Sequence, residues 1–444
     1  MTEIHVVGGG LAGTEAALQL AARGFPVTLH EMRPVRSSPA HRTGLLAELV
    51  CSNSLKSTAP TTASGCLKTE LGILGCRLLD AAGEAAVPAG SALAVDPEAF
   101  GARVEQMIED EPLVTLVRDH VSLLEPAEGR VWLVCTGPLT SPELQDELGR
   151  IAGRPGLHFF DAIAPTVTLE SLDLDVIYRA ARYGKGDADY LNIPLDEQQY
   201  TTLVDDLLAS EKITVRDFDR DLLFDGCQPI EEIAASGPRT LAFGPLRPVG
   251  LEDPRTGELP FAVVQLRQEN REGTLFGLVG FQTRIRHPDQ KRILRRLPGL
   301  ERAEFVRLGQ MHRNFYLDTP RCLNPDFSFP DRADVFVAGQ ITGVEGYVEA
   351  MASGLFTALK AAARLKGVEA APLPAETICG SLLEGFLFDG TTARLSPMNA
   401  NFGLLPHPGP GVRGKRARKE AKASRAEAAM RNWVDALPPA LAPR

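Results

Sequence analysis

The stretch from Ile4 to Glu31 constrains the fold more than any other part of this sequence. It contains a short apolar strand, the pattern G-x-G-x-x-G at Gly8, Gly10 and Gly13, a helical run and a second apolar strand that ends at Glu31. The expected elements are strands over 4–7 and 27–30 and a helix over 14–23. A glycine triplet alone is a weak signal, but this order of elements predicts a dinucleotide-binding site.

Each glycine of the pattern has its own physical role beside a dinucleotide. The first permits a tight turn, the second lets backbone amides approach a pyrophosphate, and the third lets the helix pack closely on the strand. The helix N-terminus directs partial positive charge to the phosphates. An acid about 20 residues later accepts a ribose hydroxyl. The candidate binding residues are Gly8, Gly9, Gly10, Leu11, Ala12, Gly13 and Glu31.

Two later strands also end in glycine turns. The strand 131–135 continues into Thr136 and Gly137, where a backbone can pass close to a dinucleotide. The strand 335–338 is followed by a helix rich in small residues, whose N-terminus can stabilise negative charge on a second part of a cofactor. An extended FAD needs such a late element, whereas a simple NAD site does not. The alternative is that this segment is an ordinary strand-to-helix turn without a role in cofactor binding. The candidates here are Gly339, Gln340, Gly343 and Gly346.

Composition limits the class of protein. A chain of 444 residues with 44% hydrophobic and 23% charged residues is typical of a globular protein of two or three domains. No apolar run is long enough to span a membrane, and the N-terminus leads directly into a strand, so we expect a cytoplasmic protein without membrane association. The formal charge of −10 argues against non-specific nucleic-acid binding by the whole surface.

The cysteines give no sign of a metal site or a disulfide framework. There is no C-x-x-C pair and no Cys/His cluster at zinc spacing, so we expect no metal and, in a cytoplasmic protein, free thiols. Most are expected to be small buried hydrophobic residues. They are Cys51, Cys66, Cys76, Cys135, Cys227, Cys322 and Cys379.

The pattern changes near residue 141, which indicates an inserted domain. Residues 240–282 resemble antiparallel strands, with a hairpin loop at 270–273. Strands of this kind inside an α/β protein indicate an α+β insertion over 141–314, with the first domain formed by 1–140 and 315–444. Other expected elements are helices over 69–79, 96–108 and 196–208, a strand over 113–124, and no regular core element over 32–64.

Two basic segments interrupt an otherwise acidic sequence. Each is either a solvated helix face or a surface that contacts phosphates. The first contains Arg284, Arg286, Lys291, Arg292, Arg295, Arg296, Arg302, Arg307 and Arg313. The second contains Arg413, Lys415, Arg416, Arg418, Lys419, Lys422 and Arg425.

Six motifs, spread from residue 3 to about 406, resemble one family. They are HVVGGGLAGTEAA, ELVCSNSLKS, CTGPLTS, DGCQPIEE, FVAGQITGVEGYVEA and NANFGLLP. The chain resembles the folate- and FAD-dependent tRNA (uracil-5-)-methyltransferases, the TrmFO family, with one small departure at Cys135, where alanine is expected. The resemblance implies an α/β fold: a Rossmann-like FAD-binding domain of the GR2 flavoprotein type, with an insertion.

The resemblance also implies a function. The family methylates C5 of the T-loop uridine at position 54, in the T-arm of tRNA. The methyl carbon comes from 5,10-methylenetetrahydrofolate, and NAD(P)H reduces the flavin. The family assigns the cysteine of GCQP, here Cys227, as the uracil nucleophile. It assigns the cysteine of VCSNS, here Cys51, as the partner that removes the proton near the flavin.

The chemistry of C5-methylation requires groups of these kinds. A methylene carbon must gain two electrons to become a methyl, so a hydride source is needed, and reduced flavin is one. Uracil C5 becomes nucleophilic once a thiolate adds at C6, and a base must then remove the C5 proton. Pro229 is expected at the first position of a helix, which would place Cys227 near a helix N-terminus and lower its pKa. The neighbouring acids Asp225, Glu231 and Glu232 would raise the pKa of this thiol, so the sequence leaves the direction of the pKa shift open.

Three other functions fit parts of the same pattern. The first is a plain FAD/NAD(P)H oxidoreductase. The second is a flavin-binding factor for tRNA modification or assembly without methyl transfer, which would bind tRNA even without Cys51 and Cys227. The third is a wobble-modifying relative with the same opening fold, although that family has an extra helical C-terminal domain.

Overall fold

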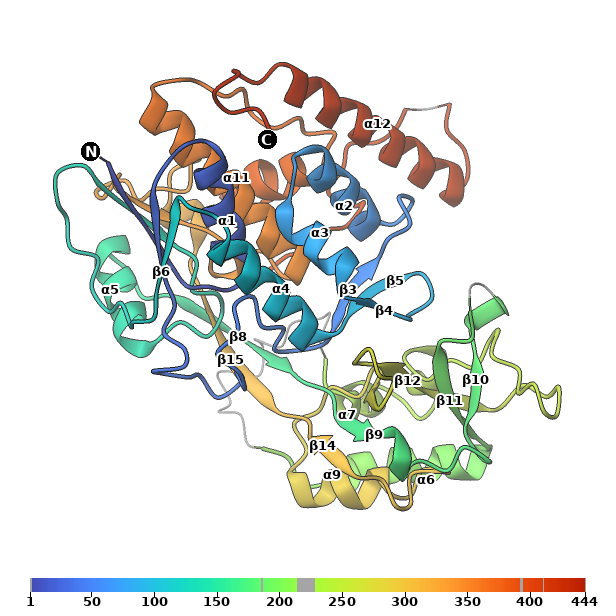
Figure 1. The fold of residues 1–444 in the computed structure, drawn as a ribbon. Helices are drawn as coiled ribbons and strands as arrows, with labels where there is room; N and C mark the ends of the chain where they lie inside the picture. Colours follow the sequence, from blue (N-terminus) through green and yellow to red (C-terminus); the bar gives the residue numbers. More distant parts are fainter. Residues whose placement is uncertain (1, 185–186, 214–227, 392–393, 410, 444) are drawn as a thin grey trace.

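The computed structural model describes residues 2–184, 187–213, 228–391, 394–409 and 411–443 (Figure 1). Cys227 and the DGC part of its motif lie outside these residues. Figure 1 shows a larger body, which contains both described ends of the chain, and a smaller body below it that is built from the middle of the sequence. In the described ranges, no helix is both long and apolar enough to cross a membrane.

A parallel sheet with the strand order β16-β7-β1-β2-β6 forms the centre of the larger body. Its strands are short, and all except the edge strand β6 are largely buried, as expected when helices cover a parallel sheet. The register pairs Val7 with His30 and Val134, and Val134 with Val337, so the strands end at one edge of the sheet. The strands are β1 (Glu3–Val7), β2 (Val27–His30), β6 (Val114–Val117), β7 (Arg130–Val134) and β16 (Val335–Val337). The predicted strands near 4–7, 27–30, 131–135 and 335–338 are confirmed.

Two helices pack against each other beside this sheet, α1 (Leu11–Ala22) and α11 (Tyr347–Lys366). Their close contact depends on a glycine, because a Cβ on Gly354 would lie 2.2 Å from the carbonyl oxygen of Ala12. The small residues predicted after Gly346 therefore serve helix packing. Around the same body lie α2 (Ala63–Ile73), α3 (Arg77–Glu84), α4 (Pro97–Glu109), α5 (Pro142–Ala152), α10 (Thr319–Cys322) and α12 (Lys415–Asp435).

The smaller body contains an antiparallel sheet with the strand order β10-β11-β12-β13-β9-β14. The predicted hairpin is confirmed as β12 paired with β13, and the predicted helix over 196–208 is α6, whose N-cap Asp196 forms a capping box with Gln199. The strands are β9 (Thr166–Thr168), β10 (Tyr178–Ala180), β11 (Tyr190–Leu195), β12 (Ala262–Gln268), β13 (Leu275–Leu278) and β14 (Phe305–Arg307). The helices are α6 (Glu197–Ala209), α7 (Ile230–Ala235), α8 (Thr240–Phe243) and α9 (His287–Leu294).

An antiparallel pair, β8 (Leu157–Ala162) and β15 (Met311–Tyr316), carries the chain between the two bodies. The buried hydrophobic residues form two main clusters, one from residues 4–148 and 315–441 and one from residues 167–303. Leu144 and Leu148 of α5 belong to the first cluster. The two clusters support the predicted division into one domain formed by residues 1–140 and 315–444 and a second domain formed by residues 141–314. This division stays a prediction.

Several predicted boundaries are wrong. The expected helix over 69–79 is two helices, α2 and α3, because Gly75 adopts a left-handed φ of 73° between them. The strand expected over 113–124 is only β6, and the stretch 32–64 contains β3 and the start of α2. Pro229 is the N-cap of α7 rather than its first residue. The small sheet to which β3 contributes consists of β3 (Ser54–Ser57), β5 (Ala92–Val95) and β4 (Ala86–Val87).

Short irregular helices complete the described structure. They are the 3-10 turns Leu169–Ser171, Arg182–Gly184, Gln340–Thr342 and Phe386–Phe388 and a π-helical turn over Gly380–Gly385. The π-helical turn is held by Glu70 of α2, whose carboxylate oxygens accept hydrogen bonds from the amides of Ile378 and Cys379 at 2.7 and 2.8 Å. Burial raises the pKa of Glu70 to about 7, against the effect of these hydrogen bonds.

We expect the Glu70 carboxyl to make folding stability depend on pH. A carboxyl whose pKa is raised by folding stabilises the protein below its unfolded pKa, and this contribution is lost as pH rises through about 7. Between pH about 5 and about 8, the wild-type protein should therefore lose on the order of 2 kcal/mol more stability than Glu70→Gln. The measurement is the urea midpoint of both proteins across this range, and parallel profiles would contradict the assignment.

Candidate functional site

The glycine turn after β1 is shaped by contacts that leave no room for side chains. Gly8 has a φ of 103°, and a Cβ there would lie 2.8 Å from the carbonyl oxygen of Cys135. A Cβ on Gly13 would lie 1.9 Å from the carbonyl oxygen of Gly8. By contrast, a Cβ on Gly10 would meet no atom within 4 Å. The second glycine therefore faces open space, which is where a pyrophosphate must pass.

Glu31 is held beside this turn by hydrogen bonds to both of its carboxylate oxygens. Its Oε2 accepts a hydrogen bond from the amide of Gly9 at 2.8 Å, and its Oε1 accepts from the amide and the Nε of Arg33 at 2.9 and 2.8 Å. Burial alone would raise the pKa of Glu31, but the hydrogen bonds and charge of Arg33 outweigh burial and hold it below its usual value. The carboxylate is thus ionised at neutral pH, and its oxygens can accept further hydrogen bonds.

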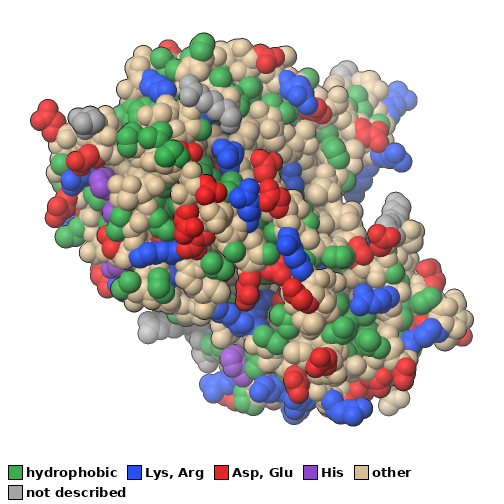
Figure 2. Space-filling view, in the orientation of Figure 1, with side chains coloured by type: hydrophobic (Ala, Val, Ile, Leu, Met, Phe, Trp, Pro, Cys, Tyr) green, Lys and Arg blue, Asp and Glu red, His purple; other side chains and the backbone are tan. Residues whose placement is uncertain are grey.

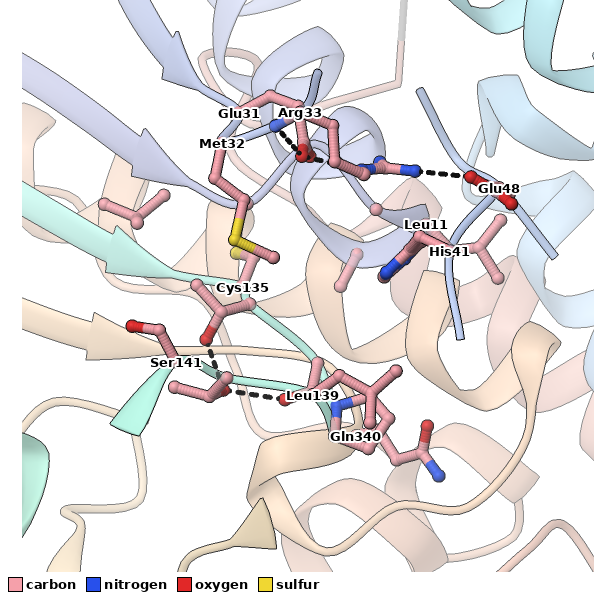
Figure 3. A pocket seen from close by; sticks show the side chains of 18 of the residues that line it. Leu11, Glu31, Met32, Arg33, His41, Glu48, Cys135, Leu139, Ser141 and Gln340 are labelled. Carbon is pink, nitrogen blue, oxygen red and sulfur yellow. Dashed lines mark hydrogen bonds and ion pairs between the residues drawn. The ribbon is translucent and has the colours of Figure 1, made fainter. Parts of the chain in front are cut away.

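A cavity, here called the cofactor cavity, lies over the turn and the ends of the parallel strands (Figure 3). Glu31, Arg33 and Glu48 lie along one side of it, and Leu139, Ser141 and Gln340 lie on the other. The sequence-predicted residues that line it are Gly8, Gly10, Leu11, Ala12, Glu31, Thr136, Gly137, Gln340 and Gly346. The carboxylate, the open glycine and the helix N-terminus fit the adenosine diphosphate end of FAD.

Four predicted cofactor residues lie behind the cavity surface. Gly9 binds Glu31 through its amide, and Gly13 packs on Gly8. A Cβ on Gly339 would lie 2.7 Å from the Cβ of Ala12, and a Cβ on Gly343 would lie 2.6 Å from Leu395. These glycines shape the turns without lining the cavity. Several other residues that line the cavity were not predicted as site residues. Four of them lie in motifs that carry the family resemblance: Glu48 in ELVCSNSLKS, Leu139 and Ser141 in CTGPLTS, and Tyr347 in FVAGQITGVEGYVEA. Met32, Arg33 and His41 lie in none of these motifs.

A second cavity, here called the Cys51 cavity, continues from the first. The two share lining residues, which include Val50, Leu139, Gln340, Gly346 and Tyr347. The combined space runs from the β1 turn to the β16 turn. An extended two-part cofactor fits this arrangement, because one end can lie at Glu31 and the other beside the second glycine turn.

Cys51 lines the second cavity and is half-buried. Its Sγ lies 3.9 Å from the carbonyl oxygen of Ala162 on β8. The amides of Cys51 and Ser52 donate hydrogen bonds to the phenolic oxygen of Tyr347 at 2.8 and 3.0 Å. Burial, together with the negative charge that Cys51 can carry, raises the pKa of Tyr347 well above its usual value. Tyr347 is therefore a neutral phenol at neutral pH and holds the Cys51 backbone in place.

Acidic side chains line the floor of the Cys51 cavity. Burial and the charge of Asp161 raise the pKa of Glu345 well above its usual range, so this carboxyl can hold a proton at neutral pH. Lys56 Nζ lies 3.3 Å from Glu349 Oε1. Among the described residues, the buried Glu349 Oε2 has no hydrogen-bond partner. The cavity thus combines a thiol with groups that can hold or accept protons.

In the first predicted basic segment, five of the nine cations form ion pairs with acidic residues. Figure 2 shows Lys and Arg side chains along the lower edge of the molecule, near α9, interspersed with acidic side chains. Their partners come from other elements of the smaller body, a fact that the sequence pattern could not reveal. The ion pairs join Arg284 to Glu232, Arg286 to Glu211, Arg292 and Arg296 to Asp206, and Arg307 to Glu269.

The second basic segment divides into two parts on α12. Lys422 and Arg425 donate hydrogen bonds to backbone carbonyls of Phe402 and His407, at 2.6 and 3.1 Å, so they hold a loop. The side chains nearer the start of the helix are more accessible to solvent. These are Lys415, Arg416, Arg418 and, partly, Lys419.

Fold and site together define the class of the protein. A parallel sheet with glycine turns after β1 and β16, interrupted by a second sheet, is a Rossmann-like FAD-binding domain with an inserted domain. Two crystal structures of Aquifex aeolicus GidA share this fold, with TM-scores of 0.69 and 0.68 at 16% sequence identity. Each alignment covers 97% of this chain, and the two alignments cover 73% and 76% of the respective GidA chains.

Sequence comparison then identifies the family. The model of the glucose inhibited division protein A family, GidA, matches residues 3–369. Two proteins named methylenetetrahydrofolate–tRNA-(uracil-5-)-methyltransferase TrmFO, from Geobacter sulfurreducens and Desulforudis audaxviator, are 51% and 50% identical over 432 residues. Each alignment covers 97% of this chain and 98% of the relative. The chain therefore belongs to the GidA family and to the TrmFO proteins, which confirms the predicted resemblance.

We expect Gly10→Val to remove the cofactor without unfolding the protein. The valine side chain would enter the open space over the turn, where it would meet a pyrophosphate but no protein atom. The affinity for FAD should fall by roughly a hundredfold, or about 2.7 kcal/mol. Flavin absorbance of the purified protein measures this loss. The matched control is Gly72→Val, at an exposed helical position with equally open space. A folded Gly10→Val protein with full flavin content would contradict the assignment.

Proposed function

We propose that the protein transfers a methyl group from 5,10-methylenetetrahydrofolate to C5 of the T-loop uridine, position 54, of tRNA. Identity of 50% to a TrmFO protein across 97% of the chain carries this proposal. The site supports it, because a cysteine lies in the wall of a cavity that continues from a dinucleotide site. Such an enzyme is a methylenetetrahydrofolate–tRNA-(uracil-5-)-methyltransferase that oxidises FADH2, and a tRNA-modifying role fits a cytoplasmic protein.

The chain's own residues would hold FAD along the combined cavities. Glu31 binds the adenosine ribose, the turn at Gly10 and the N-terminus of α1 face the pyrophosphate, and the turn from Gln340 to Gly346 borders the flavin end. When bound and reduced by NAD(P)H, the flavin supplies the hydride that converts the methylene carbon to a methyl.

Two cysteines would carry out the chemistry on uracil. The Cys227 thiolate adds to C6, which makes C5 nucleophilic toward the methylene carbon. Cys51, beside the flavin end, would accept the C5 proton, and tetrahydrofolate would leave the methylene carbon. Once that carbon has gained the hydride, Cys227 would leave C6 as its thiolate. Tyr347 supports this role by binding the amides of Cys51 and Ser52. The target uridine must be unstacked from the T-arm to reach the cavity.

Two other functions keep the same fold but not this chemistry. A plain FAD/NAD(P)H oxidoreductase would consume NAD(P)H without altering tRNA. A flavin-binding tRNA-modification or assembly factor would bind tRNA without any need for the two cysteines. Incubation with unmodified tRNA, methylenetetrahydrofolate and NAD(P)H, followed by nucleoside analysis, distinguishes all three.

We expect Cys227→Ala and Cys51→Ala each to fold, to keep FAD and to lose tRNA methylation by at least about a thousandfold, because the nucleophile and the base act within one reaction. A protein that retains Cys227 should form a covalent adduct with tRNA that bears 5-fluorouracil at the target position. The matched control is Cys322→Ala, at a buried cysteine that lines neither cavity. An adduct formed by Cys227→Ala would show that the nucleophile is misassigned.

We propose that the start of α12 contacts tRNA phosphates. Its four cations are accessible, and among the described residues only Arg416 of these four is in an ion pair, with Glu420, whereas five arginines of the first basic segment pair with acids. Replacement of Lys415, Arg416, Arg418 and Lys419 by Gln should weaken tRNA binding. It should also reduce the slope of log affinity against log salt by roughly three, because fewer counterions are released. The control replaces Arg103 and Arg150, which pair with Glu84 and Glu147. An unchanged slope would make the start of α12 a solvated helix face.

A further inference from the structure

A buried chain of ion pairs connects the ribose-facing carboxylate to the loop that carries Cys51. The guanidinium of Arg33 lies between two carboxylates, with Nε 2.8 Å from Glu31 Oε1 and Nη1 2.8 Å from Glu48 Oε2 (Figure 3). The Arg33 side chain is 2% exposed, and those of Glu31 and Glu48 are 5% and 10% exposed. A guanidinium can make both contacts because its donors form a rigid, planar fork.

Glu48 organises the loop at the far end of this chain. Its carboxylate accepts hydrogen bonds from two backbone amides at 2.8 and 3.2 Å and from Thr43 Oγ1 at 3.0 Å. The amide of Ala47 donates to the carbonyl oxygen of Gly9 at 2.8 Å, so the loop packs directly on the glycine turn. Cys51 follows Glu48 by only three positions. A shift of Glu48 is therefore transmitted to the thiol through a very short stretch of backbone.

We propose that Arg33 and Glu48 are positioning residues, which hold the Cys51 loop against the ribose-binding end of the cofactor site. Neither residue needs to touch the reacting atoms. Because Glu48 also accepts hydrogen bonds from the amides of Arg42 and Thr43, loss of its charge weakens these bonds together with its ion pair to Arg33, so the loop is held less firmly. The inference rests on the proposed function for the importance of Cys51, but its test measures the position of the thiol and needs no methyl transfer.

The test measures the rate at which iodoacetamide alkylates Cys51 in the FAD-loaded protein, by mass spectrometry of the peptide. Glu48→Gln should keep its FAD, because Glu31 still has Arg33 and Gly9 as partners, and should alkylate on the order of tenfold faster, since the loop opens locally. Arg33→Lys should alkylate faster and also bind FAD more weakly, because one ammonium cannot hold both carboxylates in the same geometry.

The double variant tests whether the two residues act as one unit. If they do, Arg33→Lys with Glu48→Gln should alkylate Cys51 no faster than the faster of the two single variants. The matched control is Glu384→Gln, which breaks the Lys360–Glu384 ion pair and a hydrogen bond from the amide of Leu373, away from both cavities. This control should leave the alkylation rate unchanged.

An unchanged or slower rate in Glu48→Gln, additive effects in the double variant, or an equal increase in Glu384→Gln would each overturn the proposal. If Glu48→Gln does not fold, Thr43→Val supplies the test. It removes the hydrogen bond that Thr43 Oγ1 donates to Glu48, and it should give a smaller increase in the alkylation rate of Cys51. In methylation assays, Glu48→Gln should lower kcat and leave the KM for tRNA unchanged. If the wild-type protein does not methylate tRNA, the proposed function fails while the alkylation pattern still decides the positioning role.

Discussion

The close approach of four backbone segments around the start of α1 is the constraint on which the rest of the structure depends. The first turn of α1 meets the end of β1 at Gly8 and Gly13, and it meets α11 and the β16 turn at Gly354 and Gly339. At each meeting point a Cβ would come within 3 Å of another atom. Glycine at these positions lets two helix N-termini, those of α1 and α11, border the same space. The cofactor cavity exists because these four positions lack side chains.

The geometry of this junction explains why the site has two ends. Segments that follow β1 and β2 surround Glu31, whereas the segment after β16 borders the Cys51 cavity. Tyr347 opens α11 and binds the amides of Cys51 and Ser52, so the same helix that packs on α1 also fixes the thiol. The architecture of the sheet thus determines the distance between the ribose-binding and the reactive ends of the site.

The predictable parts of the structure are those that depend on local backbone chemistry. The β1–α1–β2 unit, the turn at Thr136 and the hairpin of β12 and β13 follow from glycines and short apolar runs. Arg33, Glu48 and Tyr347 were missed because their roles arise from contacts across the fold; Tyr347 and Cys51 are 296 positions apart. The first basic segment was ambiguous for the same reason, since Asp206 and Glu211 neutralise its arginines from another element. The helix expected over 69–79 was wrong because apolar periodicity does not reveal the left-handed Gly75.

The pairing of β8 with β15 has a consequence for how this chain tolerates change. The two strands pair over their full length, and the amide of Ile163 donates to the carbonyl oxygen of Gln310 at 2.7 Å, so the two ends of the smaller body lie side by side. For the larger body, the whole segment between these residues is therefore a loop whose two ends are adjacent. The entropy of closing such a loop grows only slowly with its length. A change in the length of this segment therefore costs the larger body little closure entropy, and the strands that wall the Cys51 cavity can keep their register.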